Sequence, residues 1–285
     1  HRRARYLLIN CFHTASVYEQ GIAETIVGKA IRELDRSSLF IATKCRGRMG
    51  DGPNNEGLSK KHIIAACESS LKRLGLDVID LYQFHWPDAD VTVEESVSAI
   101  GLLLRQGKIL HWGISNYDAR QTADVVDVAR RLGIESPVSH QPKYNMFKRD
   151  VEDNGTLVYC GREGLGLIVY SPLEQGLLTG KYASPEDATA GTRFALRGES
   201  VSKQYLTTVN FDTLNQLKQI AADAGLTMTQ LALAWILRRP EVSAAIVGAT
   251  NVEQIESNAS AGGIVLDETT QERIKRALDK RWALI

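Results

Sequence analysis

Short apolar runs alternate with longer amphipathic stretches along most of this chain. The apolar runs are typical of strands in a parallel sheet, and the stretches between them have the spacing of helices with one buried face. The predicted strands are residues 9–13, 39–44, 78–84, 109–114, 137–140, 165–170 and 244–247. The predicted helices are residues 19–34, 59–74, 93–105, 119–132, 151–162, 211–224, 229–238, 251–261 and 269–280. This order predicts an α/β fold built from repeated βα units.

The strand pattern indicates a barrel of the (β/α)8 TIM type, which has eight parallel strands. Seven are predicted, so we expect the first β/α unit to be missing or incomplete, with its strand before His1. An unpaired edge left there would favour a homo-oligomer. No low-complexity linker interrupts the chain, so we predict a single domain over residues 1–285. The loops after the strands are long and polar, and in such barrels that rim holds the active site.

Composition excludes several kinds of partner. Lys plus Arg and Asp plus Glu both number 34, with no long run of one sign, so we expect no binding to nucleic acid. No apolar stretch approaches the roughly 18 residues of a membrane helix, so we expect no membrane insertion. The four cysteines form no CxxC pair and have no His at metal spacing, which predicts buried thiols in a cytoplasmic protein and no metal site.

Five polar segments stand at the ends of predicted strands, in a fixed order. They are His13–Tyr18 (HTASVY), Ala42–Lys44 (ATK), Gln83–Pro87 (QFHWP), Gly113–Tyr117 (GISNY) and Tyr170–Tyr182 (YSPLEQGLLTGKY). In this order they resemble the aldo-keto reductase family, from about Ile9 to the last helix. The spacing of residues 52–60 is similar to that of the bacterial and potassium-channel β-subunit-like branch. The resemblance implies an aldo-keto reductase barrel and an enzyme that reduces aldehydes or ketones with NADP(H).

The resemblance assigns the catalytic roles to three side chains. Hydride transfer to a carbonyl leaves negative charge on its oxygen, so a proton donor must stand beside it. Tyr18 takes this role, Lys44 is the cation that favours its phenolate form, and His85 donates a hydrogen bond that orients the substrate. Taken alone, a Tyr or Lys at a strand end is more often a rim residue, and a His between Phe and Trp is more often part of the core. Because all three residues occur in the order typical of the family, we interpret them as catalytic.

The fourth member of the family's catalytic set is an Asp five residues before the Tyr, and this chain has His13 there. A neutral imidazole can accept a hydrogen bond from Lys44, whereas a protonated one repels it. We therefore expect a reductase of reduced activity. The alternative is a weakly active or inactive nucleotide-binding sensor or scaffold subunit, like the family branch associated with potassium channels.

The resemblance also assigns cofactor ligands. The residues assigned to the nicotinamide are Ser115, Asn116, Gln141 and Tyr170, those for the pyrophosphate are Ser171, Pro172, Leu173, Gln175 and Gly176, and those for the adenosine phosphate are Arg193, Gly248, Gln254 and Asn258. Many relatives have Lys and Arg at the positions of Gly248 and Gln254, and often Glu at Ser257, so NADP(H) is expected and NAD(H) stays open. Arg193 is the candidate for the 2′-phosphate, with a solvated loop arginine as the alternative.

The substrate pocket is the part that the resemblance describes least. Trp86, Tyr117 and the loop 47–57 are expected to line it. The implied partner is a small carbonyl compound, with no single substrate named.

Overall fold

Seven strands follow one another in the sheet in the same order as in the chain, β1-β2-β3-β4-β5-β6-β7. This computed structural model describes residues 7, 9–187 and 205–282. The chain divides into two compact units, one of residues 1–142 and 151–168 and one of residues 143–150 and 169–285. Each unit is described by itself below, and the single-domain assignment stays a prediction.

All seven predicted strands are present. They are β1 (Cys11–His13), β2 (Phe40–Cys45), β3 (Ile79–Phe84), β4 (Ile109–Ser115), β5 (Ser139–Gln141), β6 (Gly166–Val169) and β7 (Val242–Ala245). β1 to β6 pair in parallel, each with the next. Because parallel strands end at one edge of a sheet, the residues after β1, β2 and β3 are brought together there. The eighth strand expected before His1 stays a prediction.

The helices also follow the predicted pattern, with two breaks. They are α2 (Ile22–Ile31), α3 (Lys60–Leu74), α4 (Val93–Arg105), α5 (Ala119–Arg131), α6 (Asp150–Asp153), α7 (Thr156–Glu163), α10 (Thr208–Asp223), α11 (Met228–Leu237), α12 (Val252–Ala259) and α13 (Glu268–Trp282), with short 3-10 turns η1 (Tyr18–Gly21), η2 (Arg36–Ser38), η3 (Glu174–Thr179) and η4 (Pro185–Asp187). The helix predicted from residue 19 begins only at Ile22, because Glu19 and Gln20 have positive φ. The helix predicted over 151–162 is divided into α6 and α7, and Gly155 precedes α7 in a left-handed conformation.

Side-chain caps start three helices of the first unit. The Ser59 hydroxyl accepts from His62 N, the Thr92 hydroxyl from Glu95 N, and the Asp118 carboxylate from Gln121 N. Each bond satisfies a backbone donor that has no partner inside its helix. These polar residues therefore determine where α3, α4 and α5 begin.

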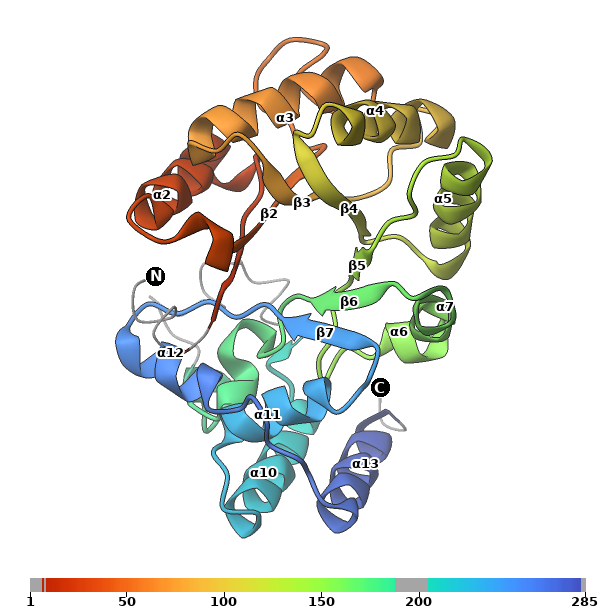
Figure 1. Cartoon of the computed structure of the whole chain (residues 1–285). Helices are drawn as coiled ribbons and strands as arrows, with labels where there is room; N and C mark the ends of the chain where they lie inside the picture. The colour runs from red at the N-terminus through yellow and green to blue at the C-terminus, as the bar shows by residue number, and fades with distance from the viewer. Residues whose placement is uncertain (1–6, 8, 188–204, 283–285) are drawn as a thin grey trace. The chain divides into compact units, whose positions relative to one another are not determined.

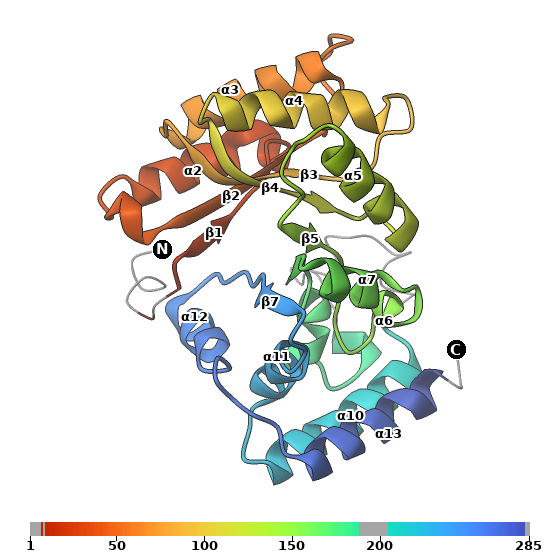
Figure 2. The same ribbon diagram turned by 45° about the vertical axis from the view of Figure 1, so that its right-hand side comes forward.

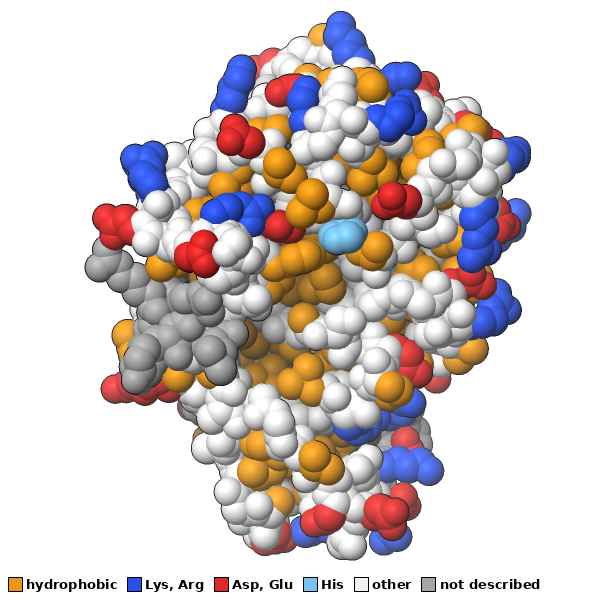
Figure 3. Space-filling view, viewed as in Figure 1, with side chains coloured by type: hydrophobic (Ala, Val, Ile, Leu, Met, Phe, Trp, Pro, Cys, Tyr) orange, Lys and Arg blue, Asp and Glu red, His pale blue; other side chains and the backbone are white. Residues whose placement is uncertain are grey.

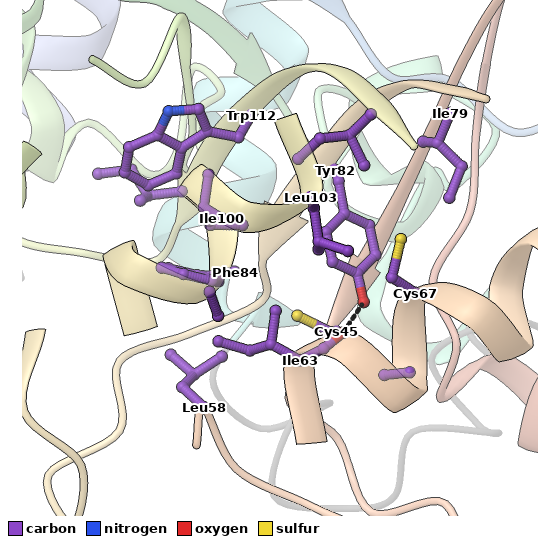
Figure 4. Close-up of a cluster of buried hydrophobic side chains, with 14 of the residues drawn as sticks. Cys45, Leu58, Ile63, Cys67, Ile79, Tyr82, Phe84, Ile100, Leu103 and Trp112 are labelled. Atoms are coloured by element: carbon purple, nitrogen blue, oxygen red, sulfur yellow. Dashed lines mark hydrogen bonds between the residues drawn. The ribbon is translucent and has the colours of Figure 1, made fainter. Parts of the chain in front are cut away.

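The core of the first unit lies between its sheet and helices α2 to α5, which cover one face of the strands (Figure 1). Figure 4 shows side chains of β3 and β4 packed against those of α3 and α4, with the Tyr82 hydroxyl donating to Ile63 O at 3.4 Å. Gly28 permits the close approach of α2 to α3, since a Cβ there would lie 2.4 Å from Leu74 O. Burial raises the pKa of the Cys45 and Cys67 thiols to about 12, so both stay protonated at neutral pH.

The second unit packs helices around the apolar α11. α10 and α13 lie side by side (Figure 2), where Arg273 and Asp223 form an ion pair at 2.6 Å. Ile246 N, just after β7, donates to Val169 O at 2.8 Å. In the part of the chain that the structure describes, no single helix could cross a membrane; α10 and α11 have the length and hydropathy only as a pair, which is bent by 91°.

Acidic and basic side chains are intermingled over the helices of the first unit (Figure 3). This distribution accords with the equal numbers of Lys plus Arg and Asp plus Glu in the chain.

Candidate active site

Three predicted catalytic side chains lie together at one edge of the first unit's sheet. Tyr18 opens η1 after β1, Lys44 lies on β2, and His85 directly follows β3. Lys44 Nζ is 4.9 Å from the centre of the Tyr18 ring. The rings of Tyr18 and His85 meet edge to face, with centroids 5.7 Å apart and an interplanar angle of 80°. The Tyr18 side chain is 40% exposed, so a solute can reach this cluster.

Lys44 is almost fully buried, with 1% of its surface exposed, and it contacts His13. Its Nζ lies 2.5 Å from His13 Nε2 and donates to Thr14 O at 3.2 Å. Burial lowers the pKa of Lys44 well below its usual value, and the carboxylate of Glu24 opposes this shift. Burial, and then the charge of Lys44, lowers the pKa of His13 well below its usual value. His13 is therefore neutral at neutral pH and accepts the hydrogen bond from Lys44.

A buried ion pair on the opposite side of β2 holds this strand in place. Glu24 of α2 is 0% exposed, accepts from the Thr43 hydroxyl at 2.6 Å and pairs with Arg73 of α3 at 2.6 Å. Successive side chains of a strand point to opposite faces, so Thr43 faces the helices and Lys44 faces away from them. The sequence did not identify Glu24 as a residue that supports the site, because it is one of several acidic residues in a predicted helix.

Two hydrogen bonds of its backbone fix the position of His85. Its N–H donates to Cys45 O at 3.0 Å, and its carbonyl accepts from the Asn116 amide at 2.9 Å. Burial, with a smaller contribution from Lys44, lowers the pKa of His85 to about 3. The imidazole is thus neutral at physiological pH, and its Nδ1 has no hydrogen-bond partner among the described residues. A neutral ring can donate a hydrogen bond to a carbonyl oxygen without adding charge.

The three nicotinamide candidates of the first unit form one hydrogen-bonded group at the ends of β4 and β5. The Ser115 hydroxyl donates to Gln141 O at 2.7 Å, and the Asn116 amide donates to the Ser115 hydroxyl at 3.1 Å. The Gln141 amide donates to the Gln83 side chain at 3.2 Å. Asn116 has a φ of 62°, a left-handed conformation that Asn tolerates better than most residues. Gln83, which sequence reasoning left out, orients Gln141 from β3.

Trp86 and Tyr117, the substrate-pocket candidates, lie in the same unit. The Trp86 ring is 4.4 Å from that of His85. Tyr117 is buried, and burial raises the pKa of its phenol, which stays protonated. Arg46, also missed in the sequence, places its guanidinium 5.0 Å from the Trp86 ring. Its position two residues after Lys44 is the signal that could have identified it.

The pyrophosphate candidates of the second unit lie in a loop with an unusual backbone. Ser171, Glu174 and Gln175 have positive φ values of 53°, 38° and 57°, and Gly176 has 94°. Asn145 ties this loop by donating to Ser171 O at 2.9 Å and to the Glu174 carboxylate at 2.7 Å.

The remaining loop candidates adjoin these residues. Tyr170 forms a parallel bridge with Lys143, while Pro172 and Leu173 lie between Ser171 and Glu174. The Gln175 side chain donates to the Ser171 hydroxyl at 3.3 Å, and its Oε1 is buried without a partner among the described residues.

Three of the four adenosine candidates lie in or just before α12. Gln254 accepts from Thr250 N at 2.9 Å, and Asn258 is buried four residues further on. A Cβ at Gly248 would meet nothing within 4 Å, so this position is open. Arg193 lies outside the described residues. Within the described residues, no group of three or more His, Cys, Asp or Glu side chains is arranged to hold a metal ion.

Comparison with known proteins gives one family. The profile of the Aldo/keto reductase family matches residues 2–279. A protein of Oryza sativa subsp. japonica named probable voltage-gated potassium channel subunit beta is 40% identical, over 90% of this chain and 79% of its own. A putative channel subunit beta of Schizosaccharomyces pombe is also 40% identical, over 96% and 81%. The L-glyceraldehyde 3-phosphate reductase of Escherichia coli K12 is 36% identical, over 91% and 77%.

Proposed function

Because this chain belongs to the aldo/keto reductase family, we propose that it reduces an aldehyde or ketone to the alcohol with NADP(H) as the hydride donor. The observation that carries this proposal is the grouping of Tyr18, Lys44 and His85, in which a partly exposed phenol has a buried amine over its ring and a neutral imidazole in edge-to-face contact with it. The closing of the sheet into an eight-stranded barrel and the cytoplasmic location stay predictions.

Each of these groups has a task in the proposed reaction. NADPH, when bound, supplies the hydride that reaches the carbonyl carbon. Tyr18 gives its hydroxyl proton to the carbonyl oxygen, which would otherwise carry a full negative charge. Lys44, when protonated, stabilises the phenolate that Tyr18 becomes. His85 donates a hydrogen bond to the same oxygen and orients it, and its low pKa keeps it neutral while it does so.

The residues of each unit fit parts of the cofactor. In the first unit, Ser115, Asn116 and Gln141 present the hydroxyl and amides that a carboxamide needs. In the second, the positive φ values of the 171–176 loop suit a loop whose backbone N–H groups surround an anion. We propose Tyr170 as the residue that stacks on the nicotinamide, and Arg193, Gly248, Gln254 and Asn258 as the surroundings of the adenosine phosphate.

A second candidate function is nucleotide binding with slow turnover. His13 favours it, because an imidazole does not balance the charge of Lys44 as a carboxylate would. The relatives named as potassium channel β subunits support a role as a subunit, and nucleotide sensing by that subunit is part of this proposal.

Stopped-flow nicotinamide fluorescence distinguishes the two functions. The protein is first titrated with NADPH and NADH, and we expect tighter binding of NADPH. The NADPH complex is then mixed with a set of aldehydes that includes glyceraldehyde 3-phosphate, the compound in the name of one relative. Oxidation of the bound NADPH within seconds supports the reductase. Binding without oxidation by any aldehyde indicates the sensor, and absence of binding rejects both.

A further inference from the structure

Four side chains of the first unit are linked by successive contacts that begin at the proposed proton donor. The ring of Tyr18 is 5.7 Å from that of His85, and the ring of His85 is 4.4 Å from that of Trp86. The guanidinium of Arg46 lies over Trp86, with Cζ 5.0 Å from the ring centre. A compound whose carbonyl reaches Tyr18 and His85 would therefore extend along Trp86 toward a cation.

The hydrogen-bonding capacity of Arg46 is largely unused. Its Nε is buried and has no partner among the residues that the structure describes. The nearest carboxylate oxygen, Oδ1 of Asp88, is 3.9 Å from Nη2, which is too far for a hydrogen bond. Asp88 is instead bound by the N–H groups of Leu58 at 2.7 Å and Asp90 at 3.2 Å. The side chain of Arg46 is 25% exposed, so an incoming ligand can reach it.

The backbone of Arg46 is strained, which indicates that the fold holds this side chain in place at a cost in conformational energy. Its φ is 118°, which non-glycine residues rarely adopt. The Arg46 carbonyl accepts from Gly57 N at 2.9 Å, and Gly47 is packed closely against Val17, the neighbour of Tyr18. Strained residues of this kind are concentrated at binding and catalytic sites.

We propose that Arg46 binds an anionic group of the substrate, so that the enzyme acts on carbonyl compounds that carry a carboxylate or a phosphate. This inference rests on the proposed function and extends it to the substrate class. The guanidinium, with Cζ over the Trp86 ring, carries its donors in a planar fork that matches either anion. Asp88 forms an ion pair with Arg46 at 3.9 Å but accepts no hydrogen bond from it at that distance, so the donors of the guanidinium stay open to a ligand.

Matched pairs of aldehydes test the proposal. Glyceraldehyde 3-phosphate is compared with glyceraldehyde, and succinic semialdehyde with butanal, using Arg46→Gln, Arg46→Lys and a control, Arg32→Gln. Arg32 is an exposed residue of the first unit at the end of α2. We expect Arg46→Gln to lower kcat/KM about 10- to 100-fold for one or both charged aldehydes and to leave the neutral ones unchanged. Arg46→Lys retains part of the activity, and Arg32→Gln changes nothing.

The two charged substrates distinguish a phosphate from a carboxylate ligand. Equal losses on charged and neutral aldehydes would overturn the proposal, since they would mean that Arg46 only supports Trp86. A wild-type enzyme that does not prefer the charged member of either pair would overturn it too.

A binding measurement keeps the test independent of turnover. Inorganic phosphate and succinate have no carbonyl that this chemistry reduces, and each is titrated while tryptophan fluorescence is followed. A saturable change that is lost in Arg46→Gln supports the anion site even if no aldehyde is reduced, in which case only the proposed function fails. No saturable change, or one that Arg46→Gln retains, rejects the site.

Discussion

Nζ of Lys44 lies 2.5 Å from Nε2 of His13, so a buried amine has an imidazole as its partner. The family that this chain resembles has a carboxylate at this place, where the sequence has His13. An imidazole accepts a hydrogen bond but brings no negative charge, and burial lowers the pKa of both groups. The ionisation of this pair therefore differs from that of the amine–carboxylate pair in the family pattern.

We predict that His13→Asp raises reductase activity with good aldehydes and shifts the alkaline limit of the pH profile upward. A carboxylate beside Lys44 favours its charged form and so raises its pKa. If the reaction needs the charged amine, the rate falls as pH rises through the pKa of Lys44, and this fall comes at lower pH in the wild type than in the variant. The measurement is kcat/KM from pH 6 to 10, and His13→Asn, which adds no charge, is the control. An unchanged profile would show that His13 is not a weakened catalytic position.

We predict that Tyr18→Phe abolishes most of the turnover and spares nucleotide binding. The substitution removes the hydroxyl that gives its proton to the carbonyl oxygen, and general acid catalysis is worth about 10²- to 10⁴-fold in rate. Single-turnover oxidation of bound NADPH measures the loss, and a fluorescence titration measures the Kd for NADPH. Full activity in this variant would remove Tyr18 from the mechanism.

Asn116 allows its side chain and its backbone conformation to be tested separately. Asn116→Gly and Asn116→Ala both lose the hydrogen bonds to His85 O and to Ser115, but only Ala is strained at a φ of 62°. We expect both to bind NADPH more weakly to a similar extent, and Ala to lose about 1 kcal/mol more of the free energy of unfolding. NADPH titration and urea unfolding measure the two effects. Wild-type affinity in Asn116→Gly would show that the amide is not a ligand.

Glu174 is the residue on which the 171–176 loop of the second unit depends. It is fully buried, with its carboxylate 2.8 Å from Lys143 Nζ and bound by the Asn145 amide. Glu174→Gln leaves Lys143 without its counter-charge, so we expect a loss of about 2–4 kcal/mol in the free energy of unfolding and weaker binding of NADPH.

Urea unfolding measures the stability of this variant, and fluorescence titration measures its nucleotide affinity. The exposed Glu268→Gln, which makes the same chemical change on α13, is the control. A stable variant with normal affinity would mean that the loop keeps its conformation without this ion pair.

Local pattern was enough to predict most of the fold and part of the candidate site. The apolar runs located all seven strands, and Ser59 located the start of α3, because a strand's periodicity and a helix cap act over a few neighbouring residues. The break at Glu19 and Gln20 was missed, because both residues have positive φ, which the helical spacing of the apolar residues does not indicate. Arg46 and Gln83 were missed for a similar reason, since their neighbours come from other strands.

The sequence by itself was enough to predict the family and to select Tyr18, Lys44 and His85 as catalytic residues. Each of the strand-end segments is recognised from a few consecutive residues, and their order along the chain can be read without the fold. Only the folded chain decided that Glu24 lies on the other face of β2 and that the guanidinium of Arg46 lies over the Trp86 ring. These relationships join residues distant in the chain, and the ionisation of the buried groups depends on water excluded by the whole packed unit.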